Sequence, residues 1–137
     1  MSRAARPSDV DEICGSLPET EFGTSWGDVP TWKVPRGEKG KGFLLYRHPH
    51  STAVDADGQM YDDLLVIVTA GPGEKAALVE DPSSPFFTID HFRNYNAVLV
   101  QQSRLGELDV AELREVITDA WAHRAPKKLV KEYFADE

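Results

Sequence analysis

The sequence predicts a single soluble domain of the α+β class. Its 137 residues are enough for one domain and too few for two. A hydrophobic share of 41% with 28% charged residues is typical of a globular protein and excludes collagen-like or largely disordered chains. Stretches with helical spacing lie on both sides of stretches that read as strands, and no repeat or linker divides the chain.

The N-terminal part of the chain predicts a short helix after a loose end. Residues 1–7 are polar and are expected to be flexible, so the domain is expected to span residues 8–134. The helix is expected to begin at Ser8 as its N-cap and to end at Pro18. Its apolar residues follow helical spacing: Val10, Ile13, Cys14 and Leu17. Cys14 therefore falls on the core face and is expected to be unreactive.

The next part of the chain changes to a pattern typical of strands. Three strands are expected over residues 21–26, 31–34 and 42–47. The break from Pro35 to Gly40 is expected to be a turn, and such a short connection usually makes an antiparallel hairpin. Two later strands are expected over 64–69, whose continuous apolar run suits a strand buried on both faces, and over 96–101.

Three further helices are expected in the second half of the chain. A short one covers residues 74–80, and Asp81–Pro82 ends it. The longest covers residues 110–123, because Asp109 and Glu112 resemble a capping box and the apolar residues behind them recur at helical spacing. Pro126 breaks it, and a final short helix is expected over residues 127–134.

Two basic segments stand out in a chain whose formal net charge is -8. Residues 32–50 hold five basic residues against the single acid Glu38: Lys33, Arg36, Lys39, Lys41 and Arg47. Residues 123–131 hold four and no acid: Arg124, Lys127, Lys128 and Lys131. A basic hairpin can lie along a phosphate backbone or enter the major groove. The alternative is that these lysines only keep a solvated sheet edge soluble.

The overall charge limits the kinds of partner that the sequence favours. An acidic molecule repels phosphate backbones and anionic membranes, so only a local basic patch, acting within about 8 Å at physiological salt, can bind DNA. The longest apolar run, Leu64–Val68, is too short to cross a membrane, so no membrane partner is expected. A single cysteine and a charged N-terminus favour a cytoplasmic location.

Patterns for catalysis or metal binding are weak. His48 and His50 lie near several aspartates, but no third histidine or cysteine is close, and the aspartates do not match a calcium loop around Gly58. No nucleophile elbow and no complete phosphate loop is present. We therefore expect no metal site, no cofactor and no catalytic residues, and an enzyme is the least supported class.

The best local constellation is the aromatic segment of residues 86–95. His91 stands there between Asp90 and Arg93, so it can line a pocket and change charge near neutral pH. The alternative is a loop held by hydrogen bonds of His91 and Arg93 while the aromatic rings fill the core.

Several segments together resemble the MmcQ/YjbR-like family of small bacterial proteins, from about residue 8 to residue 134. The matching motifs include residues 17–27, 30–34, 86–100 and 119–129, with Thr24, Trp26, Gly27, Lys33, Thr88, His91, Tyr95, Trp121 and Pro126 at family positions. Asp90 and Asn96 depart from it, because proline is expected at both. The resemblance implies an antiparallel sheet flanked by helices, in a so-called double-wing arrangement, and a DNA-binding role without known catalytic residues.

The leading hypothesis is therefore a non-enzymatic DNA-binding protein. Its expected phosphate contacts are Lys33, Arg36, Lys39, Lys41, Arg47, Arg124, Lys127 and Lys128. The alternative is a domain that binds a small anionic ligand in a cleft lined by Trp26, Lys33, His91, Arg93, Tyr95 and Trp121. A third reading is a protein–protein adaptor, for which an exposed apolar patch would be the structural sign.

Overall fold

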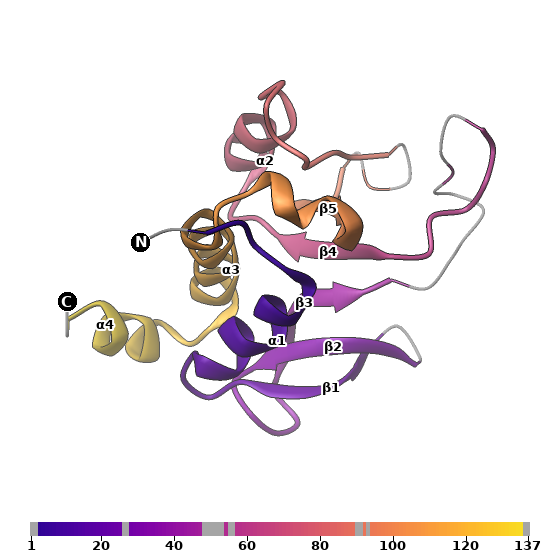
Figure 1. Cartoon of the computed structure of the whole chain (residues 1–137). Helices are drawn as coiled ribbons and strands as arrows, with labels where there is room; N and C mark the ends of the chain where they lie inside the picture. The colour runs from indigo at the N-terminus through magenta and orange to yellow at the C-terminus, as the bar shows by residue number, and fades with distance from the viewer. Residues whose placement is uncertain are drawn as a thin grey trace.

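The computed structural model describes residues 3–25, 28–47, 54, 57–89, 92 and 94–135. Figure 1 shows a sheet with helices packed against it. In chain order the elements are α1 (Pro7–Ser16), β1 (Glu21–Ser25), β2 (Val29–Val34), β3 (Lys41–Tyr46), β4 (Leu64–Val68), α2 (Pro72–Val79), β5 (Ala97–Gln101), the 3-10 helix η2 (Gln102–Glu107), α3 (Val110–Arg124) and α4 (Lys127–Ala135).

The five strands form one antiparallel sheet in the order β1-β2-β3-β4-β5, which confirms the expected α+β class. Each expected strand is present, and its ends shift by two residues or fewer. The β2–β3 connection is an antiparallel hairpin, with Val34 opposite Lys41 beside the turn. All five residues of β4 are buried, as its unbroken apolar run predicts for a strand covered on both faces.

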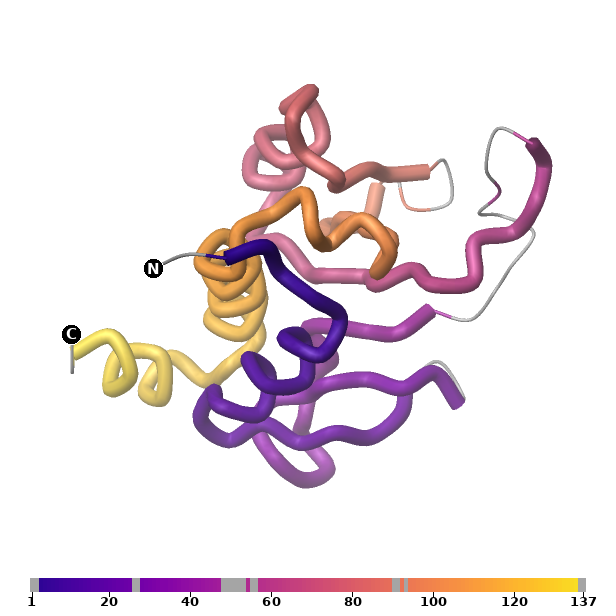
Figure 2. Tube along the Cα trace, in the orientation of Figure 1, coloured from indigo at the N-terminus to yellow at the C-terminus, as the bar shows by residue number. Residues whose placement is uncertain are grey.

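Both faces of the sheet are covered, by different parts of the chain. Helices α1 and α3 cover one face, where Ile13, Phe43, Ile67 and Trp121 belong to the larger core cluster. The segment before β5 covers the other face, where Phe92 packs with Leu45, Val66 and Leu99. Figure 2 shows that α1 and α3, far apart in sequence, lie side by side. Phe86 and Phe92 of this segment thus supply aromatic rings to the core.

The N-terminal segment differs from the expected loose end. Residues 3–6 run beside the start of α3, where the Ala5 amide donates to the Leu108 carbonyl and the Val110 amide to the Arg3 carbonyl. Helix α1 begins at Pro7, so Arg6 and not Ser8 is its N-cap. The physical reason is Asp9, whose buried carboxylate accepts the Arg6 amide at 2.8 Å and pairs with Arg3 at 2.6 Å.

Helix α3 follows the sequence closely. The Asp109 side chain accepts from the Ala111 amide at 2.8 Å, and Glu112 accepts from the Asp109 amide at 3.1 Å, so the expected capping box is present. The 3-10 helix η2 just before it was not expected. None of the helices that the structure describes is long and apolar enough to cross a membrane.

Candidate functional site: a basic surface and an acidic groove

The turn between β2 and β3 is held against the loop that joins α1 to β1. Arg36 donates from Nε to the Thr20 carbonyl at 3.1 Å, and the Gly37 amide donates to Oε1 of Glu21 at 3.1 Å. The turn is tight: a Cβ at Gly40 would lie 2.7 Å from the Pro35 carbonyl oxygen. Only glycine fits there, so the backbone around the exposed Lys39 and Lys41 is fixed.

The end of α3 is held against the same loop. Trp121 is fully buried and donates from Nε1 to the Pro18 carbonyl at 2.9 Å. Its ring packs edge-on against Tyr133 of α4, with 5.0 Å between the ring centroids. Trp121 therefore fixes both the C-terminal end of α3 and helix α4 beside the loop of residues 17–20.

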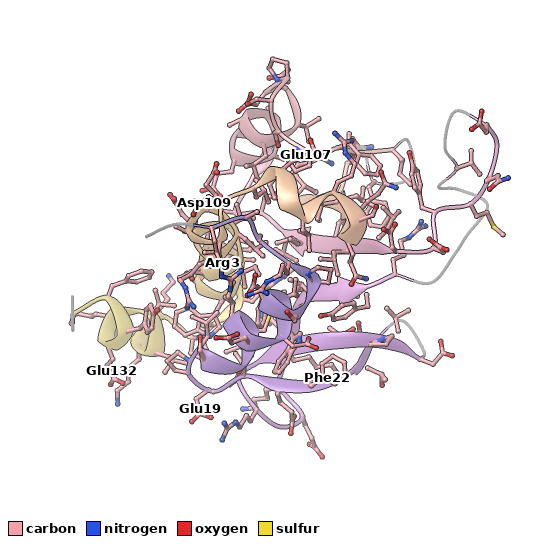
Figure 3. All side chains as sticks on the ribbon, in the orientation of Figure 1. Arg3, Glu19, Phe22, Glu107, Asp109 and Glu132 are labelled. Carbon is pink, nitrogen blue, oxygen red and sulfur yellow. The ribbon has the colours of Figure 1, made fainter. Side chains whose placement is uncertain are left out.

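These contacts bring the two basic segments to one end of the molecule. We call this region the basic surface; it consists of Lys33, Arg36, Lys39, Lys41, Arg124, Lys127, Lys128 and Lys131. Four glutamates lie within or beside these segments: Glu19, Glu21, Glu38 and Glu132. With them, the net charge of the basic surface is +4. Figure 3 labels Glu19 and Glu132 at this end, beside the α1–β1 loop and on α4.

Arg47 does not join the basic surface. It follows the last residue of β3, whereas Lys41 is the first, and six strand residues separate the two ends by about 20 Å. Its guanidinium lies over the Phe92 ring, 5.2 Å from the centroid, and burial lowers its pKa. The structure thus places this expected phosphate contact at the far end of the hairpin.

The residues of the expected anion pocket do not converge, as far as the structure describes them. Trp121 belongs to α3 and lies in the core on one face of the sheet, whereas Tyr95 packs edge-on against Phe92 on the other face. Lys33 lies beside the β2–β3 turn. Trp26, His91 and Arg93 lie outside the described residues.

The sequence analysis missed Lys75, which is only 8% exposed. Its Nζ donates to the Phe92 carbonyl at 2.6 Å and to the Tyr95 carbonyl at 2.8 Å, and burial lowers its pKa. It ties α2 to the segment before β5. Its helical position next to apolar residues was the only signal in the sequence, and that signal does not reveal which carbonyls it meets.

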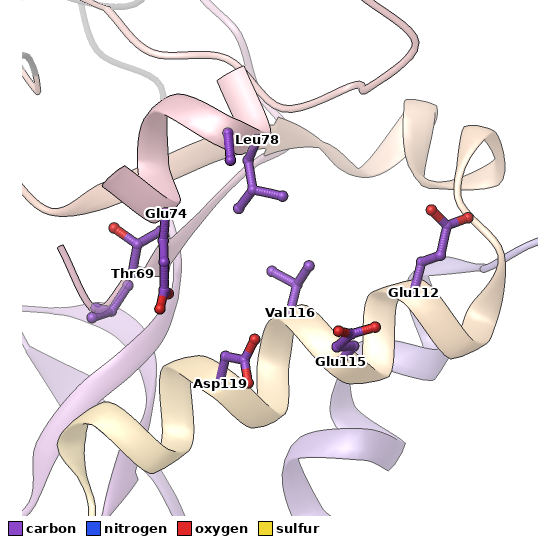
Figure 4. Close-up of a pocket in the computed structure, with 9 residues that line it drawn as sticks. Thr69, Glu74, Leu78, Glu112, Glu115, Val116 and Asp119 are labelled. Atoms are coloured by element: carbon purple, nitrogen blue, oxygen red, sulfur yellow. The ribbon is translucent and has the colours of Figure 1, made fainter. Parts of the chain in front are cut away.

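A second feature is a groove between α2 and α3, which we call the acidic groove. It encloses about 390 Å³, within the range of ligand sites. Its apolar lining comes from Val68, Ala77, Leu78 and Val116, and its polar lining from Thr69, Glu74, Glu112, Glu115 and Asp119. Figure 4 shows Glu112, Glu115, Val116 and Asp119 on the α3 side, facing Leu78 and Glu74 across the hollow.

The charges of the acidic groove are not neutralised within the groove. Burial first, and then the charges of Glu74 and Glu115, raise the pKa of Asp119. No lysine or arginine is among the described residues that line the hollow, and no group of carboxylates in the described part of the chain is arranged to hold a metal ion. The combination of apolar side chains with carboxylates suits an organic cation or a basic segment of a protein.

Comparison with known proteins identifies the family. A family model described as YjbR matches residues 15–123. Three curated relatives, each named an uncharacterized protein, come from Mycobacterium bovis and two strains of Mycobacterium tuberculosis; each is 42% identical over 74 residues, which are 54% of this chain and 55% of the relative. The chain spans about half the length of these relatives, and no solved structure matches significantly. The chain belongs to the YjbR family.

Proposed function

We propose that this protein is a non-enzymatic DNA-binding protein that contacts double-stranded DNA through the basic surface. The observation that carries the proposal is that one short loop holds both the β2–β3 turn and the end of α3, which leads into the second basic segment. Arg36 holds the Thr20 carbonyl, and Trp121 holds the Pro18 carbonyl two residues earlier. The turn and the start of α4 can therefore contact the phosphates of one duplex together.

The charge balance sets the strength expected of this binding. The basic surface carries +4 in a chain of -8, so the rest of the molecule carries −12 and repels DNA at long range. Binding then depends on short-range contacts between lysines and phosphates. For about three such contacts, raising the salt from about 50 to about 200 mM should weaken binding about 40-fold.

The test is a fluorescence-anisotropy titration of a labelled duplex at these two salt concentrations. The variant Lys39→Glu/Lys128→Glu reverses two exposed charges, one in each basic segment. It should bind DNA at least tenfold more weakly at low salt, and its binding should depend less steeply on salt. The matched control Arg104→Glu/Arg114→Glu makes the same change in net charge at exposed positions outside the surface.

The control variant should stay within about threefold of the parent protein. An equal loss in both variants would show that only net charge matters and would remove the basic surface from the account. No binding of the parent protein at low salt, where electrostatic attraction is strongest, would reject the DNA-binding function itself.

A further inference from the structure

We propose that a second copy of this chain docks its helix α4 into the acidic groove. Both partners of this contact are present in the structure, and they complement each other in charge, in apolar surface and in spacing. The proposal does not require DNA binding, but Lys127 and Lys131 also belong to the basic surface, so a dimer and DNA would compete for these two lysines.

The groove offers an apolar floor between two acidic walls. Leu78 of α2 and Val116 of α3 face each other across it, and the hollow continues past them into a second one of about 240 Å³, lined partly by Phe86 and Leu108. Glu115 and Asp119 lie one helical turn apart on the same wall. Like charges at this spacing destabilise a helix. A partner that carries basic side chains next to an apolar side chain would therefore complement both the carboxylates and the apolar floor.

Helix α4 offers the complementary surface on its outer side. Leu129, Val130 and Tyr133 pack against the core of the same chain. Lys127, Lys131 and Phe134 then follow at positions i, i+4 and i+7, within an arc of about 60° on the outside of the helix. Both lysines are exposed, and Phe134 is 40% exposed, which is high for an aromatic residue.

The spacing of the charges agrees on the two sides. Lys127 and Lys131 are separated by four residues, as are Glu115 and Asp119, so both pairs are about 6 Å apart along their helices. A helix laid along α3 can therefore pair both lysines with both carboxylates. In the antiparallel orientation Lys131 pairs with Glu115, and Phe134, three residues farther on, lies over the Glu112 end, where the second hollow offers Leu78 and Phe86.

The placement of the elements favours a mutual exchange between two copies. Helices α2, α3 and α4 follow one another along one side of the molecule (Figure 1). The same side of each copy thus presents both the groove and the helix, as a two-fold symmetric dimer requires. A single nine-residue helix buries less than the roughly 800 Å² per partner of a stable complex, so even the doubled contact should be weak and salt-dependent.

The test measures self-association of the full chain by sedimentation equilibrium at about 50 and 500 mM salt. The parent protein should form dimers with a dissociation constant in the micromolar range, weakened at least tenfold at high salt. The groove variant Glu115→Lys/Asp119→Lys should be monomeric, because the two carboxylates that would pair with Lys127 and Lys131 are then replaced by like charges. The helix variant Lys127→Glu/Lys131→Glu should also be monomeric, because the helix and the groove are then both acidic.

An equimolar mixture of these two variants is the decisive sample. The unchanged helix of the first variant then meets the unchanged groove of the second. The acidic helix of the second meets the two new positive charges in the groove of the first. The mixture should recover dimers to within about threefold of the parent affinity. Two monomeric variants that fail to associate when mixed would overturn the proposal, as would a parent protein that stays monomeric at low salt.

Thermal melting of each variant separates lost association from lost folding. If a charge variant does not fold, Phe134→Ser tests the apolar half of the contact with a single exposed substitution. It should weaken self-association at least fivefold at both salt concentrations, and an unchanged affinity would contradict the docking of α4.

Discussion

The basic surface and the acidic groove both depend on α3, but they differ in what explains their charges. Arg124 lies in the last turn of α3 and Glu112 in the first, where the helix dipole favours a cation and an anion respectively. Glu112 also caps the helix through the Asp109 amide. These two charges therefore need no further function.

Glu115 and Asp119 have no such explanation. They lie in the middle of α3, outside the turns in which the helix dipole acts, and no ion pair among the described residues includes them. The lysines of the basic surface can be explained by solubility alone, whereas Glu115 and Asp119 are like charges one helical turn apart, and burial raises the pKa of Asp119. The acidic groove therefore has a like-charge repulsion that a basic partner would relieve, whereas the basic surface has charges that solvent alone can accommodate.

The largest expected effect concerns the residue that joins the basic segments. Trp121→Ala should lower the free energy of unfolding by about 3–5 kcal/mol, because it removes a fully buried ring. Trp121→Phe keeps most of the ring but loses the hydrogen bond to Pro18, so it should cost about 1–3 kcal/mol. Urea unfolding measures both values. A cost below 1 kcal/mol for the alanine variant would contradict the role of Trp121 as an anchor.

The next effect concerns α2, which forms the other wall of the acidic groove. Lys75→Met removes the Nζ hydrogen bonds to the Phe92 and Tyr95 carbonyls, although both carbonyls keep a backbone amide donor, and should cost about 1–3 kcal/mol. Lys39→Met, the same substitution at an exposed turn position, should change stability by less than about 0.5 kcal/mol. Equal effects of the two substitutions in urea unfolding would show that Lys75 does not tie α2 to the segment before β5.

A smaller effect is the pH dependence that Asp9 confers. Hydrogen bonds from Arg3 lower its pKa to about 2, below its ordinary value of 3.8. The carboxylate therefore stabilises the folded state above about pH 5, and this contribution is lost as the pH falls from about 4 toward 2. Because the Arg3 side chain is 44% exposed and its charge is partly screened, we expect the Asp9 carboxylate to contribute about 1–2 kcal/mol to the free energy of unfolding.

The matched variant is Asp9→Asn, studied by urea unfolding at several pH values. It should be less stable than the parent protein at pH 7, and the difference should shrink steadily below pH 4. A difference that stays constant down to pH 2 would show that the ion pair is not its source.

The smallest effect tests the acidic groove without a partner. Since the pKa of Asp119 is raised, its ionisation costs folding free energy once the pH rises above the ordinary carboxyl range. Asp119→Asn should therefore stabilise the isolated chain by up to about 0.5 kcal/mol at pH 7 and have almost no effect at pH 3. A loss of stability at pH 7 in thermal melting would mean that Asp119 already has a favourable partner.

The sequence predicted the elements well where local rules decide. The capping box at Asp109 and the apolar run of β4 depend on near neighbours, and both are confirmed. The start of α1 was wrong because Arg3 and Asp9 act together over six residues, a contact that no spacing rule describes. Trp121 was correctly expected to pack, but its hydrogen bond to Pro18 spans 103 residues and could not be foreseen.

The sites were predicted less well than the fold. Both basic segments were found from composition, but their meeting at the loop of residues 17–20 depends on tertiary contacts. The acidic groove was missed entirely, because carboxylates are frequent in this sequence and only the packing of α2 beside α3 brings Glu74 opposite Asp119.

The most direct test of the division between the two regions is a backbone-amide NMR titration with a short DNA duplex at low salt. The account predicts shifts at residues 36–41 and 124–128, and none at residues 74–78 or 112–119 beyond those that follow a change in self-association, which dilution of the free protein measures separately. Shifts centred on the acidic groove, or spread evenly over both regions, would contradict the assignment of phosphate binding to the basic surface.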